Sequence, residues 1–117
     1  MNTRRVFLFV WIVSLSIAIG AFAQKAPKIT ISAERIPTPG HIDVRGSGFT
    51  PKRNVSSHLR RPDGGEFPVI PILTDERGEF THDIDTLLLQ VGVHELWVVD
   101  EAAKTTSNRV KFEVTAY

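Results

Sequence analysis

The feature that most constrains this chain is the alternation of apolar and polar residues downstream of residue 24. Ile29 and Ile31 lie on either side of Thr30, and Ile42 and Val44 are separated by a single aspartate. Side chains on a strand point to opposite faces in turn, so a period of two is typical of strands that bury one face. Helical periodicity is almost absent from this part of the chain. The pattern therefore predicts an all-β domain.

Clusters of glycine, proline and aspartate divide the alternating pattern into seven expected strands. These strands cover residues 29–32, 41–45, 55–59, 67–74, 80–84, 92–100 and 108–115. Pro68 and Pro71 favour an edge position, or else a bulge, for the fourth of them, because proline cannot donate a ladder hydrogen bond. Residues 85–90 are expected to form one helical turn or an irregular crossover.

Strands with one apolar face need a second layer to cover that face. We expect two antiparallel sheets packed face to face, which is an immunoglobulin-like β-sandwich of about seven strands. A chain of 117 residues has room for one domain. The sandwich is expected to fill residues 24–117.

Residues 1–23 are expected to be an N-terminal signal peptide. Two arginines precede an almost entirely apolar run over residues 6–19, and an Ala-Phe-Ala cleavage signal stands before Gln24. The protein is therefore predicted to be exported, to the periplasm or out of a bacterial cell.

Two alternatives for this segment stay open. The apolar run approaches the roughly 20 residues that span a bilayer, so an uncleaved segment would anchor the protein in the membrane. Residues 3–8, Thr-Arg-Arg-Val-Phe-Leu, resemble the twin-arginine export motif, which would imply passage in the folded state.

Charge and cysteine content narrow the expected partners. The whole chain carries 14 Lys and Arg against 13 Asp and Glu. Loss of Arg4 and Arg5 with the signal leaves 12 basic residues and a net charge of −1, so no nucleic-acid partner is expected. The chain has no cysteine, and it therefore lacks disulfides, thiolate nucleophiles and thiolate metal ligands.

Residues 44–51, Val-Arg-Gly-Ser-Gly-Phe-Thr-Pro, contain two glycines after a strand-like run. A phosphate-binding loop would require a helix N-terminus after the glycines, but a proline and another expected strand follow here. Gly46 and Gly48 are instead predicted to let the strand bend. Phe49 is expected to fold back into the core.

Five short motifs resemble the immunoglobulin-like domains of bacterial surface and envelope proteins, including the group called TIG or IPT. They are Pro39-Gly40, Ile42-x-Val44-x-Gly46-Ser47-Gly48-Phe49-Thr50-Pro51, Arg61-Pro62-Asp63-Gly64, Thr74-Asp75-x-x-Gly78-x-Phe80 and Gly92-x-His94-x-Leu96-x-Val98-x-Asp100. The resemblance extends from Lys28 to Val114. It implies architecture more than function, because such domains serve adhesion, spacing, carbohydrate contact and subunit docking alike. His94 departs from the pattern, which usually has an aromatic residue there.

The residues that carry chemistry do not form a recognisable site. His41, His58, His82 and His94 fall on four different expected strands, without metal-ligand spacing. Ser57 and His58 are neighbours on a strand and so point to opposite faces. We expect no catalytic residue, no metal site, no cofactor and no enzyme activity. His94 is expected to face inward and to donate a ring N–H to a nearby carbonyl.

The strand 92–100 offers a candidate partner-binding surface. If His94, Leu96 and Val98 face the core, as the resemblance implies, the alternate residues face outward. These residues are Val93, Glu95, Trp97 and Val99. An exposed tryptophan between valines would be a candidate contact surface. The opposite parity, with Trp97 in the core, stays open.

These observations predict an exported, non-catalytic binding module. Its partner would be an envelope or extracellular protein, or a second copy of the chain, contacted through a sheet face or edge. The alternative is a structural or adhesive element that contacts carbohydrate at the cell surface. A third hypothesis is an envelope protein that handles copper or zinc.

Overall fold

The computed structural model describes residues 26–116, so the predicted signal peptide and its cleavage point lie outside the described residues. The described part contains nine strands and one 3-10 helical turn. They are β1 (Lys28–Ile31), β2 (Arg35–Pro37), β3 (His41–Ser47), β4 (Asn54–Arg60), β5 (Ile70–Leu73), β6 (Phe80–Asp85), η2 (Thr86–Leu88), β7 (Gly92–Asp100), β8 (Thr105–Thr106) and β9 (Val110–Thr115).

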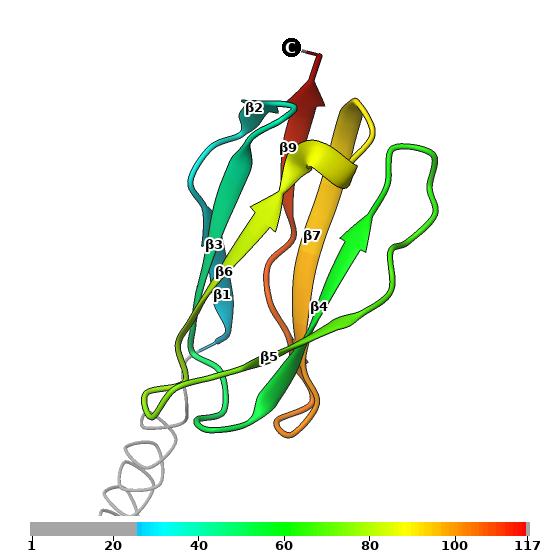
Figure 1. Ribbon diagram of the computed structural model, residues 1–117. Coiled ribbons are helices and arrows are strands. Elements are labelled where there is room, and N and C mark those ends of the chain that lie inside the picture. The colour runs from blue at the N-terminus through cyan, green and yellow to red at the C-terminus, as the bar shows by residue number, and fades with distance from the viewer. Residues whose placement is uncertain (1–25, 117) are drawn as a thin grey trace, which may run out of the picture.

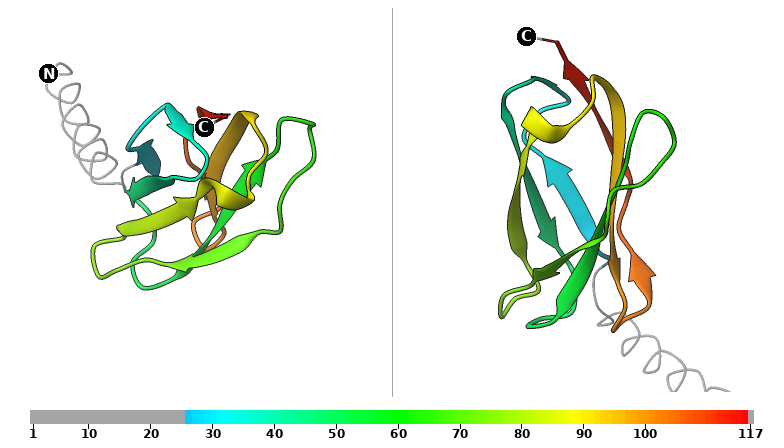
Figure 2. Two further views of the ribbon diagram at one scale, coloured as in Figure 1. Left: turned by 45° about the horizontal axis from the view of Figure 1, so that its top comes forward. Right: turned by 45° about the vertical axis from the view of Figure 1, so that its right-hand side comes forward.

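The strands form two sheets that face each other (Figures 1 and 2). The smaller sheet has the order β1-β3-β6, and the larger has the order β2-β9-β7-β4-β5, with β8 paired to β7. Apolar residues from both sheets form one buried cluster between them. The expectation of an all-β domain with two sheets is therefore confirmed, and the arrangement fits an immunoglobulin-like sandwich.

Two strands were not expected from the sequence, and one of them departs from the expected antiparallel pairing. The chain leaves the smaller sheet after Ile31, and β2 then joins the larger sheet, where it runs parallel to β9, with Arg35 opposite Glu113. The two unforeseen strands, β2 and β8, have only three and two residues. Segments this short lack the alternation that reveals a strand in a sequence.

The core consists of the inward residues of the longer strands. Its fully buried members are Ile29, Ile42, Val44, Val55, Leu96, Val98, Phe112 and Val114, and Phe49 and Phe80 are nearly so. The rings of Phe49 and Phe80 lie 5.4 Å apart and are tilted by 49°, an arrangement that aromatic pairs favour. Phe49 therefore occupies the core as predicted.

The two glycines of residues 44–51 have different structural roles. Gly46 lies within β3, where a Cβ atom would stand 2.2 Å from the ring of Phe80, so only glycine lets that ring close over the strand. Gly48 has φ +81°, which favours glycine. The chain then turns into β4 through a segment held by Asp100, whose carboxylate accepts hydrogen bonds from the backbone and hydroxyl of Thr50. The stretch turns the chain, as the sequence indicated.

Candidate partner-binding surfaces

The outer face of β7 carries the four residues singled out in the sequence. His94, Leu96 and Val98 are buried on the inner side, and Val93, Glu95, Trp97 and Val99 alternate with them on the other side. Val93 is 52% exposed, whereas Trp97 is only 6% exposed. The expected stripe of exposed Trp and Val side chains is therefore absent, although these residues do lie outside the core.

Trp97 is covered by side chains from β4 and from the segment just before β9. His58 on β4 is its cross-strand partner and stacks on it, with ring centroids 5.3 Å apart. The guanidinium carbons of Arg109 and Arg60 lie 4.0 and 5.2 Å from the centre of the indole ring. These distances are typical of cation–π contacts. The indole ring of Trp97 is thus shielded from solvent although it lies outside the core.

The cations over Trp97 also form ion pairs on the same face. The carboxylate of Glu95 lies 3.5 Å from Arg60 and 3.4 Å from Arg109, and Glu66 lies 3.8 Å from Arg60. The face is therefore a closed network of charges above an aromatic ring. A partner would meet guanidinium groups and Val93 here before it could reach the indole.

His94 is fully buried in the core. Its ring lies between Phe112 at 5.3 Å and Phe67 at 6.5 Å, nearly parallel to both. Nδ1 is 3.2 Å from the carbonyl oxygen of Gly92, and Nε2 has no hydrogen-bond partner among residues 26–116. Burial lowers the pKa of His94 from its ordinary value of 6.5, although the hydrogen bond to Gly92 acts in the opposite sense. The inward position and the contact with a carbonyl agree with the sequence prediction.

The other histidines lie apart from one another. His41 is 2.9 Å from Asp83 on the outer face of the smaller sheet, His58 stacks on Trp97, and His82 lies on β6 at the margin of its sheet. Within residues 26–116, no three histidine, aspartate or glutamate side chains come together in a group that could hold a metal ion.

An apolar groove, which the sequence did not reveal, lies between the two sheets on the side of β5 and β6. Its volume is about 360 Å³. It is lined by Ser57, Leu59, Phe67, Pro68, Ile70, His82, Asp83, Ile84, Asp85, Leu88 and Leu89. Ile70 and Leu88 on its rim are 47% and 81% exposed. Exposed apolar side chains gathered around a groove are a mark of interaction sites.

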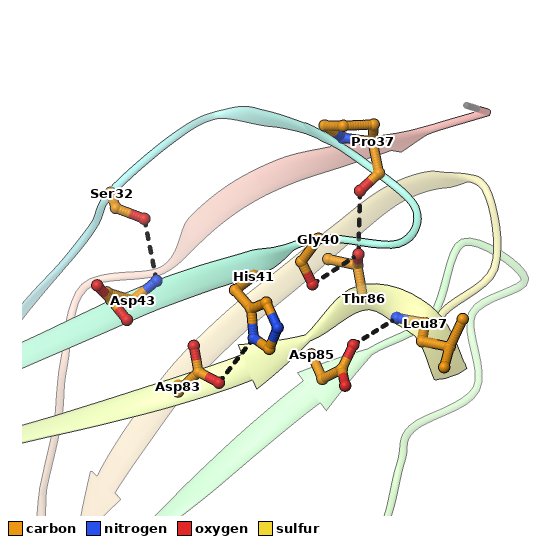
Figure 3. A network of polar contacts seen from close by, with 9 residues as sticks. All are labelled: Ser32, Pro37, Gly40, His41, Asp43, Asp83, Asp85, Thr86 and Leu87. Carbon is orange, nitrogen blue, oxygen red and sulfur yellow. Dashed lines mark hydrogen bonds and ion pairs between the residues drawn. The ribbon is translucent and has the colours of Figure 1, made fainter.

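The turn η2 holds one wall of this groove in place (Figure 3). The buried hydroxyl of Thr86 lies 3.0 Å from the carbonyl oxygens of both Pro37 and Gly40. The carboxylate of Asp85 accepts a hydrogen bond from the backbone of Leu87, 2.9 Å away, and so caps the turn. These bonds fix the turn to the end of the sandwich, and Leu88 consequently stays at the groove although most of its side chain is in solvent.

Two strand edges are closed to further pairing by identifiable residues. On β1, the side chain of Asn108 accepts a hydrogen bond from the N–H of Ile29 at 2.8 Å and donates one to its carbonyl at 3.1 Å. On β5, Thr74 donates its N–H to Arg53 at the β4 side, so the alternation of the ladder points Pro71 away from β4. Proline has no N–H to offer a new strand there.

The remaining edge strands, β2, β6 and β8, differ in length, and β8 has only two residues. β2 has three residues and ends in Pro37, which makes it a poor template for pairing. β6 has six residues, all paired with β3, and no proline. In the described part of the chain, β6 is therefore the longest edge strand that no such device closes, and it lies directly beside the apolar groove.

Within residues 26–116, no helix has the length and apolar character needed to cross a membrane. No protein-family model and no curated protein matches this chain.

Two solved structures are similar to the chain. The CARDB domain of a Pyrococcus furiosus protein, determined in complex with di-metal ions, has a TM-score of 0.46 and 10% identity, over 79% of this chain and 93% of that domain. An endo-β-1,4-mannanase from Thermotoga petrophila has a TM-score of 0.51 and 13% identity, over 83% of this chain and 21% of the enzyme. The chain thus spans about a fifth of the mannanase, and at this identity the likeness shows the fold alone.

Proposed function

We propose that this protein is an exported, non-catalytic binding module of the TIG or IPT type that contacts an envelope or extracellular protein through a sheet face or edge. The observation that carries the proposal is the apolar groove beside the open edge of β6. Its exposed rim, Ile70 and Leu88, is costly to leave in water unless something covers it at least part of the time.

The outer face of β7 is the second surface in this proposal. Val93, Glu95, Trp97 and Val99 remain the candidate contact residues there, and Val93 is the exposed apolar member. A carbohydrate-binding platform usually presents an open aromatic face, whereas Trp97 is covered by Arg109, Arg60 and His58. This covering favours a protein partner over a carbohydrate for the β7 face.

Site-specific photocrosslinking in living cells tests the proposal directly. The full chain is expressed with a photoreactive phenylalanine analogue at position 88 or position 93, and at position 104 as a control on the far β7–β8 turn. We expect an adduct of defined mass at position 88 or 93 and none at the control. An absence of adducts at both test positions, in cells that export the protein, would contradict a protein-binding role.

A further inference from the structure

We propose that β6 and the groove beside it take up an extended segment of a partner protein as an added β-strand. The segment would alternate apolar residues that enter the groove with outward residues that include lysine or arginine. This inference rests on the proposed function and names its site and the chemistry of its partner.

The backbone of β6 points free hydrogen-bonding groups toward the groove side. Asp43 on β3 forms two hydrogen bonds with Ser32, on the side of β1. The N–H of Ser32 donates to the carbonyl of Asp43 at 3.0 Å, and the N–H of Asp43 donates to the hydroxyl of Ser32 at 2.9 Å. Asp83 is the cross-strand partner of Asp43. In an antiparallel ladder the two must therefore form a non-hydrogen-bonded pair, in which Asp83 directs its N–H and C=O away from β3.

The same alternation applies two residues earlier, at Thr81. Thr81 and Asp83 together offer two donors and two acceptors to an incoming strand, and β6 has no other neighbouring strand within residues 26–116. Strand addition uses such a row of backbone groups for affinity, while side-chain pockets supply specificity. The groove supplies the pockets, because its floor holds Leu59 and Ile84 and its rim holds Leu88.

The charges around the groove indicate which kind of segment could bind there. Asp83 and Asp85 are the charged residues of its lining, and no lysine or arginine lines it. His41 lies 2.9 Å from Asp83 and offsets its charge only when protonated. Two copies paired edge to edge through β6 would bring these aspartates together, and like charges on neighbouring strands are unfavourable. A basic partner segment is favoured over a second copy of the chain.

Selection from a display library of random nine-residue peptides on the purified, processed protein supplies a probe. We expect the enriched peptides to alternate apolar residues with others that include lysine or arginine. Their affinity should fall about tenfold or more in Leu88→Lys. Leu87→Lys is the matched control, because Leu87 is adjacent and 62% exposed but does not line the groove. The affinity of the selected peptides for Leu87→Lys should stay within about twofold of their affinity for the wild type.

The pairing mode and the charge are tested with the best selected peptide. Methylation of the peptide's backbone nitrogens that face β6 should abolish binding, whereas methylation of the intervening nitrogens, which face away from β6, should leave binding intact. Bound peptide should slow hydrogen exchange at the amides of Thr81 and Asp83. Asp83→Asn should weaken binding of the basic peptide several-fold, whereas Asp43→Asn, which alters the facing residue outside the groove, should change it little.

Several outcomes overturn the inference. The first is that the wild type enriches no peptide more strongly than the Leu88→Lys variant does. The second is that the selected peptides bind Leu88→Lys as tightly as the wild type. The third is that bound peptide leaves hydrogen exchange at the amides of Thr81 and Asp83 unchanged. Self-association of the pure protein that Leu88→Lys abolishes would show a second copy in the groove instead. Crosslinking at position 93 without position 88 would leave the proposed function standing and remove this site, whereas crosslinking at neither contradicts both.

Discussion

At the residue scale, Trp97 shows how a large aromatic side chain is buried outside the core. Its ring is shielded by the cations of Arg109 and Arg60 and by His58. We predict that Arg109→Ala destabilises the protein by about 1 kcal/mol and shifts the Trp97 fluorescence to the red, because one face of the ring becomes hydrated. Acrylamide quenching and urea unfolding measure both effects.

Arg35→Ala serves as the control for this experiment, because Arg35 pairs with Glu113 at 3.2 Å and makes no contact with the indole. Processed protein is the sample of choice, since Trp97 is its only tryptophan once residues 1–23 are removed. If wild-type emission is already red and easily quenched, the shielding described here is wrong.

His94 gives the protein an acid sensitivity of predictable sign. Its pKa is lowered by burial in the folded state, so the unfolded chain binds the proton more readily. Stability should therefore be complete above pH 6.5, the ordinary value, and decline as the pH falls below it. We predict that this decline is largely lost in His94→Phe, as measured by thermal unfolding between pH 7.5 and about pH 5.

His41 is the matched control, because its shift has the opposite sign. The hydrogen bond and charge of Asp83 raise the pKa of His41, so its contribution is present below pH 6.5 and is lost as the pH rises through the folded-state value. His41→Gln should leave the acid decline in place. Equal pH profiles for the wild type and His94→Phe would refute the assignment to His94.

At the element scale, β3 depends on a position without a side chain. A methyl group at Gly46 would stand 2.2 Å from the ring of Phe80, which itself packs on Phe49. We predict that Gly46→Ala costs about 1–3 kcal/mol through overpacking. In the Phe80→Leu background the same change should cost clearly less, because the clashing ring is gone. Additive effects in this double-mutant cycle would contradict the contact.

The longer elements were predictable from the sequence because their patterns are local. β7 begins and ends where the glycine at 92 and the aspartate at 100 suggested, and Pro71 correctly indicated an edge strand. β2 was not predictable, because its pairing with β9 joins residues almost 80 positions apart and its three residues do not alternate. Tertiary contacts alone define such a strand.

The exposure of Trp97 could not be predicted for a related reason. Both faces of β7 carry large apolar residues, so the alternation that reveals a core face is weak there. Its covering depends on Arg60, on β4, and Arg109, in the segment just before β9, which come from either side of β7. The groove was equally hidden, because its lining comes from four separated segments of the chain. The run of three leucines at 87–89 is a visible signal of it, but in the sequence it indicates only a helical turn or an irregular crossover, and the structure shows a 3-10 turn there.

At the scale of the whole molecule, the predicted signal peptide determines which residues the mature protein should contain. We predict that the chain recovered from its native envelope or medium begins at Gln24 and lacks residues 1–23, because the Ala-Phe-Ala signal precedes that position. Intact-mass measurement decides this. A mass that includes Met1 would show that the segment is retained, as it would be in a membrane anchor.

The state of the strand edges also bears on how large an assembly this protein could build. Within residues 26–116, Asn108 occupies the edge of β1, prolines end or interrupt β2 and β5, β8 has two residues, and β6 is the long edge left to be extended. Polymers grow only from subunits that have two sites of attachment. With one long open edge, a subunit would act as a chain terminator in growth by strand addition, because no second long edge is left for a third molecule to extend.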